Sequence, residues 1–123
     1  MCIRDRDEVT ITGETFVAAC SASTSVKTFT ISPGDFGLQP QLATGRSEGP
    51  LQNARVIRAI LDGDKNTDFA AARDFVIINA AAALYLADIV KDLQNATAMA
   101  RESVDSGRAA SKLEALIRET NRS

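Results

Sequence analysis

Asp7 and Glu8 are the residues of this sequence best suited to chemistry, because they form an acidic pair at the head of a strand-like run. Hard divalent cations such as magnesium prefer carboxylate oxygens, and they usually take one or two protein carboxylates together with substrate phosphates. Adjacent side chains in a strand point to opposite faces. The pair could therefore share one ion only at a strand end or turn, and would otherwise serve two. On residue types alone, a solvated acidic dipeptide is the commoner arrangement.

The composition excludes several other kinds of chemistry. Histidine is absent from the 123 residues, so triads built on imidazole and His-ligated zinc are excluded, and chemistry must come from carboxylates or a metal. The 16 acidic and 14 basic residues give a net charge of -2 and form no basic stripe, so nucleic acid is not expected as a partner. No apolar run reaches the roughly 20 residues that a membrane-spanning helix needs.

The two cysteines, Cys2 and Cys20, are too few for a disulfide framework and lack the CxxC spacing, which fits a cytoplasmic location. Cys20 lies in an apolar run, so we expect a small core residue there rather than a nucleophile. Residues 1–6 resemble a translated sequencing adapter. We expect the natural sequence to continue from about Asp7.

The first part of the sequence, residues 7–31, predicts short strands, because β-branched and aromatic residues recur at period two. Val9 and Ile11 alternate with threonines in the first run. The second run, residues 15–20, is mostly apolar and could be buried on both faces. Residues 26–31 form the third run, and the polar residues 21–25 before it are typical of a hairpin connection.

A loop is predicted over residues 32–40, which contain two prolines and two glycines. Asp35, Phe36 and Gly37 in this loop match the magnesium tripeptide of protein kinases. The other kinase motifs are missing from the sequence, so we interpret the match as chance.

Helices are predicted after residue 50, each with a period near 3.6. The first spans residues 51–61, with Gly63 in a C-terminal cap position. The second spans residues 72–87 and is apolar almost all round, which predicts burial on every side. The last segment, residues 93–119, should break at Ser106 and Gly107, with Ser106 as the N-cap of the final helix.

Asn79 lies on the interior side of the second predicted helix, where a buried amide must find hydrogen-bond partners. It could fix a loop or a substrate. Alternatively it is a structural amide bonded to neighbouring backbone, which we favour because buried polar side chains mostly bond to backbone.

The predicted fold is α/β, with short mixed or antiparallel strands followed by three or four helices. So few strands cannot cover a wholly apolar helix, which indicates the C-terminal piece of a larger α/β protein. A family resemblance supports this interpretation. The stretches that carry it are residues 7–10, 35–38, 53–63, 72–85, 100–107 and 113–114. Together, and in this order, they resemble the C-terminal end of the anthranilate phosphoribosyltransferases.

The resemblance implies transfer of the 5-phosphoribosyl group from phosphoribosyl pyrophosphate to anthranilate, with release of pyrophosphate, in tryptophan biosynthesis. It also implies that Asp7 and Glu8 bind the Mg²⁺ that accompanies the pyrophosphate, while the other residues are scaffold and none is catalytic. Members of the family form homodimers through a small helical N-terminal domain. Residues 7–123 would supply only the C-terminal portion of the larger α/β domain. Because the N-terminal domain and substrate loops are missing, we expect the isolated chain to be inactive and to expose Phe29, Phe75 and Ile78.

Two alternatives stay open. One is a fragment of an enzyme like the related pyrimidine nucleoside phosphorylases, which the coding sequence ahead of Asp7 would distinguish. The other is a non-catalytic α+β interaction module, which should show a cooperative, monomeric thermal transition.

Overall fold

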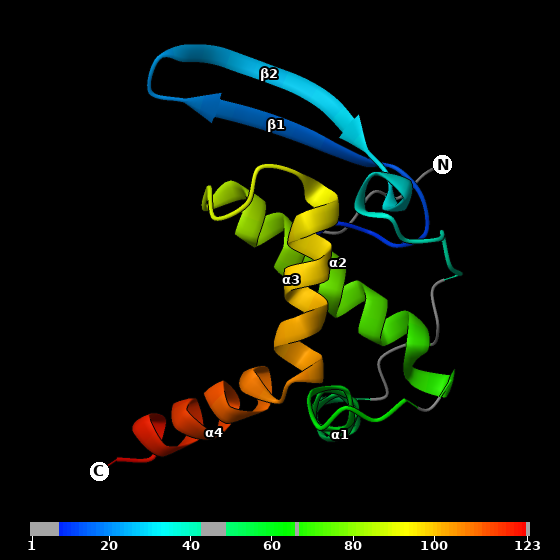
Figure 1. Ribbon diagram of the computed structural model, residues 1–123, viewed down its shortest axis with the longest axis vertical. Helices are drawn as coiled ribbons and strands as arrows, with labels where there is room; N and C mark the ends of the chain where they lie inside the picture. Colours follow the sequence, from blue (N-terminus) through cyan, green and yellow to red (C-terminus); the bar gives the residue numbers. More distant parts are fainter. Residues whose placement is uncertain (1–7, 43–48, 66, 123) are drawn as a thin grey trace.

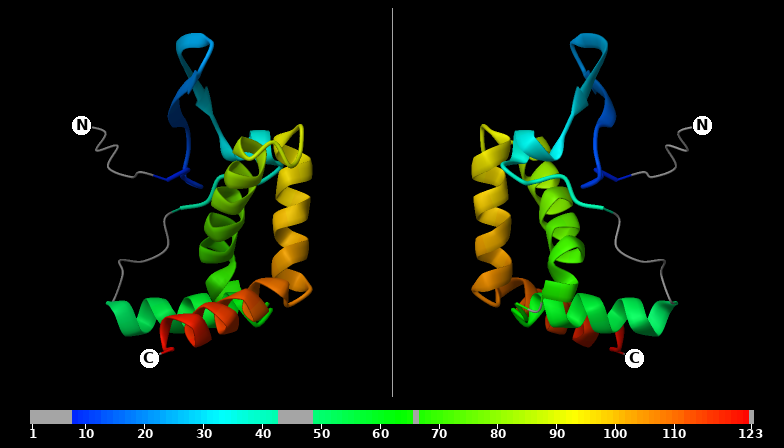
Figure 2. Two further views of the ribbon diagram at one scale, coloured as in Figure 1. Left: turned by 90° about the vertical axis from the view of Figure 1, so that its left-hand side faces the viewer. Right: turned by 90° about the vertical axis from the view of Figure 1, so that its right-hand side faces the viewer.

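The computed structural model describes residues 8–42, 49–65 and 67–122, which form a two-stranded antiparallel sheet followed by four α-helices (Figure 1). The elements are β1 (Thr15–Ser21), β2 (Thr24–Ile31), α1 (Pro50–Leu61), α2 (Ala70–Leu86), α3 (Leu93–Asp105) and α4 (Arg108–Thr120). Helices α2 and α3 run side by side, with the hairpin at one end of the pair and α1 and α4 across the other end (Figure 2). The predicted α/β class, with antiparallel strands before the helices, is confirmed.

The hairpin joins β1 to β2 in a register that pairs Thr15 with Ile31 and Ser21 with Thr24, with an irregularity between Ala19 and Ser21. The two later strand predictions and the hairpin connection are therefore confirmed. The expected strand over residues 9–12 is wrong. Threonine hydroxyls take up backbone N–H groups there: Thr10 N donates to Thr15 Oγ1 at 3.1 Å, and Thr12 N donates to Thr10 Oγ1 at 3.2 Å. Such local bonds compete with a strand ladder.

Burial of β1 on both faces is also contradicted. Its side chains are mostly exposed, and Cys20 is exposed rather than a core residue. Phe16 is 56% exposed and Phe29 is 48% exposed, because the described chain places no further strand beside this two-stranded sheet. The expected exposure of Phe29 is thus confirmed. Phe75 is partly buried against the core, and the expected exposure of Ile78 is wrong, because Ile78 is completely buried as a member of the core cluster.

The hydrophobic core lies between α2, α3 and the segments that flank the hairpin. Its buried members are Ile11, Phe36, Leu38, Ala71, Ile77, Ile78, Ala81, Ala96 and Ala100. The small alanines let α2 and α3 approach closely, and Ile77, Ile78 and Phe36 fill the space between the elements. The core therefore spans the sequence from Ile11 to Ala100.

The tripeptide Asp35-Phe36-Gly37 builds a turn that inserts an aromatic ring into this core. It belongs to a short 3₁₀ helix, η1 (Pro33–Phe36), in which the Asp35 carboxylate accepts bonds from Ser32 N at 2.7 Å and Ser32 Oγ at 3.0 Å. Phe36 is 1% exposed. Gly37 ends the turn at φ 71°, a left-handed conformation that favours glycine. Each residue of the tripeptide thus has a structural role.

The helix boundaries follow the predictions closely. Gly63 follows α1 at φ 80°, which confirms the cap there, and the break between α3 and α4 falls at residues 106–107. The N-cap of α4 is Gly107 rather than Ser106, because Ser106 keeps a helical backbone at the end of α3. Helix α2 is not buried all round: Leu86 is 82% exposed and Tyr85 is 46% exposed. Among the described helices, none is long and apolar enough to cross a membrane.

Candidate functional site

Glu8 is the first residue that the structure describes, and its side chain is exposed. Asp7, the other member of the predicted acidic pair, lies outside the described residues. The chain after Glu8 is anchored at Ile11, which is 5% exposed within the core and whose carbonyl accepts a bond from Gln41 N at 2.9 Å. Glu8 therefore stands at the surface, a few residues from a fixed point of the fold.

The side chain of Asn79 in α2 forms two hydrogen bonds with the backbone of Val9, the residue directly after Glu8. We call these two bonds the Asn79 clasp. Asn79 Oδ1 accepts a bond from Val9 N at 2.9 Å, and Nδ2 donates to Val9 O at 3.0 Å and to Phe75 O at 3.0 Å. The interpretation of Asn79 as an amide bonded to backbone is confirmed. Sequence reasoning missed the identity of the partner, because 70 residues separate Val9 from Asn79 and no local spacing reports such a contact.

The residues of the acidic segment, Asp7 and Glu8, carry the carboxylate oxygens that magnesium prefers as ligands. Within the described ranges, no group of three or more His, Cys, Asp or Glu side chains could hold a metal. A magnesium site does not need such a group, since one or two carboxylates and the phosphates of a substrate complete its shell. Glu8 offers one carboxylate with free access from solvent, and Asp7 is the predicted second ligand.

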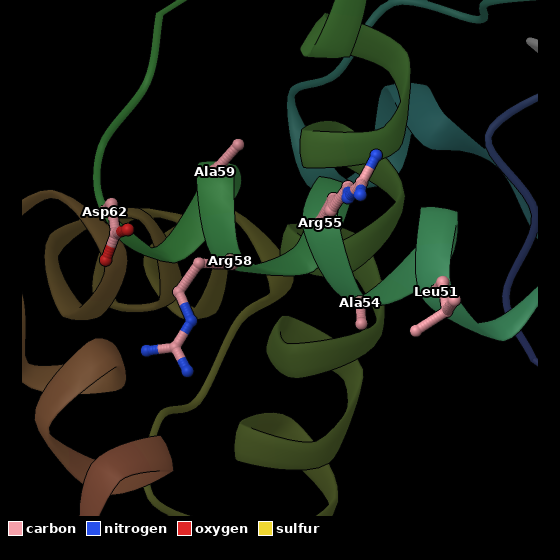
Figure 3. Close-up of a pocket in the computed structure, with 6 residues that line it drawn as sticks. All are labelled: Leu51, Ala54, Arg55, Arg58, Ala59 and Asp62. Carbon is pink, nitrogen blue, oxygen red and sulfur yellow. The ribbon is translucent and has the colours of Figure 1, made fainter.

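A separate open groove follows α1 and is lined by Leu51, Ala54, Arg55, Arg58, Ala59 and Asp62 (Figure 3). All six residues come from this one helix and its C-terminal cap. The side chains of Arg55 and Arg58 extend in different directions and do not converge on one point (Figure 3). Arg58 forms an ion pair with Glu114 of α4, and this hydrogen bond and charge raise the pKa of Arg58. The groove therefore has no pair of cations arranged to hold an anion.

The remaining candidate side chains are exposed and do not gather into a site. Four basic side chains are exposed on α1 and α4, as is usual for solvated helix faces: Arg55, Arg58, Lys112 and Arg118. Cys20 is exposed on β1, and the sequence holds no histidine that could activate it. Glu8, together with the hydrogen bonds from Asn79 to the neighbouring Val9, is therefore the arrangement best suited to chemistry among the described residues.

The chain is similar to curated anthranilate phosphoribosyltransferases. It is 40% identical to the one from Agrobacterium fabrum over 94% of this chain and 32% of that protein. The one from Moorella thermoacetica is 42% identical over 90% of this chain and 32% of that protein. The chain thus spans about a third of the length of these relatives.

Solved structures give the same result. Anthranilate phosphoribosyltransferase from Saccharomyces cerevisiae in complex with 4-fluoroanthranilate superposes with a TM-score of 0.79 at 30% identity, covering 89% of this chain and 31% of that one. The structure of that enzyme with PRPP and Mg superposes with a TM-score of 0.74 at 30% identity, over 89% of this chain and 30% of that one. Residues 2–110 match the family model described as glycosyl transferase family, a/b domain. Since this match covers most of the chain, the protein belongs to that glycosyl transferase family.

Proposed function

We propose that this chain is the C-terminal portion of an enzyme that transfers the 5-phosphoribosyl group from phosphoribosyl pyrophosphate to anthranilate and releases pyrophosphate, in tryptophan biosynthesis. The observation that carries the proposal is the 40% identity to the Agrobacterium fabrum relative over 94% of the chain. Turnover requires the portion of the enzyme beyond this chain, including the substrate loops. The complete enzyme is a cytoplasmic homodimer that assembles through its N-terminal domain.

Within that enzyme, Asp7 and Glu8 bind the Mg²⁺ that accompanies the pyrophosphate group. The proposal is supported by the exposed carboxylate of Glu8 and by the similarity of this chain to a yeast enzyme solved in complex with PRPP and Mg. Bound magnesium supplies positive charge that neutralises the charge developing on the pyrophosphate as it departs. The two carboxylates hold the cation at the surface of this portion. The next residue, Val9, is tied to α2 by its hydrogen bonds with Asn79.

A chimaera tests the proposal: residues 7–123 replace the matching segment of the Agrobacterium fabrum enzyme. Phosphoribosyl transfer is then followed by the loss of anthranilate fluorescence. We expect magnesium-dependent turnover by the chimaera and none by the isolated chain. A chimaera that is dimeric and melts cooperatively but shows no turnover would contradict the proposal.

The coding sequence ahead of Asp7 provides a second test, because the host enzyme supplies the substrate loops of the chimaera. The complete natural protein is expressed and assayed both with anthranilate and with a pyrimidine nucleoside plus phosphate. We expect transfer to anthranilate alone. Phosphorolysis of the nucleoside would assign the chain to the phosphorylase alternative.

A further inference from the structure

We infer that Asn79 is a positioning residue for Glu8, because its amide fixes the peptide unit from which Glu8 presents its carboxylate to the cation. The inference rests on the proposed magnesium role of Glu8. It adds a residue of α2 that acts through the backbone of Val9 rather than through contact with the ion.

The geometry of the clasp carries the inference. The N–H group of Val9 belongs to the same planar peptide unit as the carbonyl group and Cα of Glu8. Asn79 Oδ1 accepts that N–H at 2.9 Å, while Nδ2 donates to the carbonyl of Val9 at 3.0 Å. Both peptide units around Val9 are thereby tied to α2. The position of the Glu8 Cα relative to the helix follows from this tie.

Asn79 is itself held in place. Its Nδ2 also donates to Phe75 O, one turn earlier on α2, at 3.0 Å. The adjacent residues Ile77 and Ile78 are completely buried, so this turn of α2 is anchored in the core. A primary amide can both accept and donate hydrogen bonds, as all three bonds of Asn79 require, whereas a carboxylate lacks the donors.

Among the described residues, the hydrogen bonds from Asn79 are the polar ties of the Val9 backbone to α2, and packing of Val9 against the core is the other contact that holds it. Glu8 to Glu14 lie outside any strand ladder, and among described residues the next ties along the chain are the bonds at Thr10 N and Ile11 O. Without Asn79, the peptide unit between Glu8 and Val9 would lose its hydrogen bond to α2, and only the partly buried Val9 side chain would hold it near the core. The carboxylate would then sample more positions, and each would bind the cation less well on average.

The test uses the chimaera with Asn79→Leu, which keeps the volume of the side chain, and Asn79→Ala, which does not. The first measurement is hydrogen–deuterium exchange of the peptide that covers residues 8–14 without metal, where we expect exchange about fivefold faster. The second is the magnesium concentration at half-maximal activity, where we expect an increase of about 10-fold to 100-fold with little change in kcat at saturating magnesium. Asn79→Gln retains the amide and should recover part of both effects.

Thr97→Ala is the matched control. The Thr97 side chain is 2% exposed, and its hydroxyl donates to Leu93 O at 2.8 Å within α3. The substitution should therefore lower stability without changing either measurement. Unchanged exchange and unchanged magnesium dependence in a folded Asn79→Leu or Asn79→Ala chimaera would overturn the inference, as would equal changes in Thr97→Ala.

Glu8→Gln in the same chimaera separates this inference from the proposed function. If Glu8→Gln leaves the magnesium dependence unchanged, the proposed ligand role is wrong, and the inference fails with it. If Glu8→Gln shifts the dependence and the Asn79 variants do not, only the positioning role is wrong.

Discussion

Arg58 of α1 forms an ion pair with Glu114 of α4. The pair joins the two helices through residues that lie 56 positions apart in the sequence. The Arg58 side chain is 46% exposed and that of Glu114 is 54% exposed. Solvent screens such pairs, so their contribution to stability is small. The pair links α4 to α1, and α4 buries none of its residues in the described chain.

This pair predicts a stability contribution that does not change near neutral pH. The hydrogen bond from Arg58 to Glu114 and the charge of that carboxylate raise the pKa of Arg58. A raised pKa stabilises the fold below the ordinary arginine value, and this contribution is lost only as the pH rises through the higher folded value. We expect Arg58→Met to lower the thermal midpoint of the chimaera slightly, and by the same amount at about pH 6 and about pH 9.

Arg55→Met provides the control for the ion pair, because Arg55 is exposed on the same helix and has no ion pair among the described residues. It should leave the midpoint unchanged at both pH values. A loss of stability for Arg58→Met that grows between the two pH values would contradict the assignment of the pair.

The acidic pair predicts an altered magnesium requirement. Asp7→Asn and Glu8→Gln in the chimaera should each raise the magnesium concentration at half-maximal activity by about 10-fold or more, because each removes the charge of a proposed anionic ligand. The measurement is a magnesium titration of initial rates. Asp35→Asn is the control, since Asp35 caps a turn through Ser32 and should leave the titration unchanged. A normal titration for both Asp7→Asn and Glu8→Gln would exclude them as ligands.

The turn that carries Phe36 predicts a large loss of stability on truncation. Phe36 is 1% exposed in the core, so Phe36→Ala should lower the free energy of unfolding by about 3–5 kcal/mol. Urea unfolding of the chimaera measures the change. Phe36→Leu keeps most of the volume and should cost less than about 1.5 kcal/mol. Equal losses for the two variants would show that the ring does not fill the core as described.

The exposed hairpin predicts the behaviour of the isolated chain. Phe16 pairs with Thr30 and Phe29 with Val17, so the two exposed rings lie on opposite faces of the hairpin. The isolated chain should bind a hydrophobic dye and self-associate. Phe16→Thr and Phe29→Thr should each reduce dye binding, whereas Thr28→Ser should not. A monomeric chain with a cooperative transition and no dye binding would instead favour the independent module.

Local sequence patterns predict where the helices and strands lie, whereas long-range contacts determine which of their side chains are buried. The period of the apolar residues and the glycines at 63 and 107 were enough to place the four helices. Burial was harder to predict, because it depends on which elements come to lie against a strand or helix. Cys20 and Leu86 are therefore exposed although both lie in apolar runs.

The same limit applies to the candidate site. The residue types predict a metal ligand at Glu8 and a backbone-bonded amide at Asn79, but they do not predict that the two residues are connected. Their connection runs through Val9, and neither periodicity nor spacing encodes a contact across 70 residues. The alternation of Val9 and Ile11 also predicted a strand, whereas side-chain hydrogen bonds from Thr15 and Asn79 take up the backbone there.

The hydrogen bonds between Asn79 and Val9 join residues that are 70 positions apart, which has a consequence for the order of folding. Closing a loop of 70 residues costs chain entropy, and that cost must be met before the two bonds to Val9 can form. During synthesis Val9 leaves the ribosome before Asn79 is made, so these two hydrogen bonds cannot form until α2 has been synthesised. Assembly of the segment that carries the proposed magnesium ligands thus waits for α2.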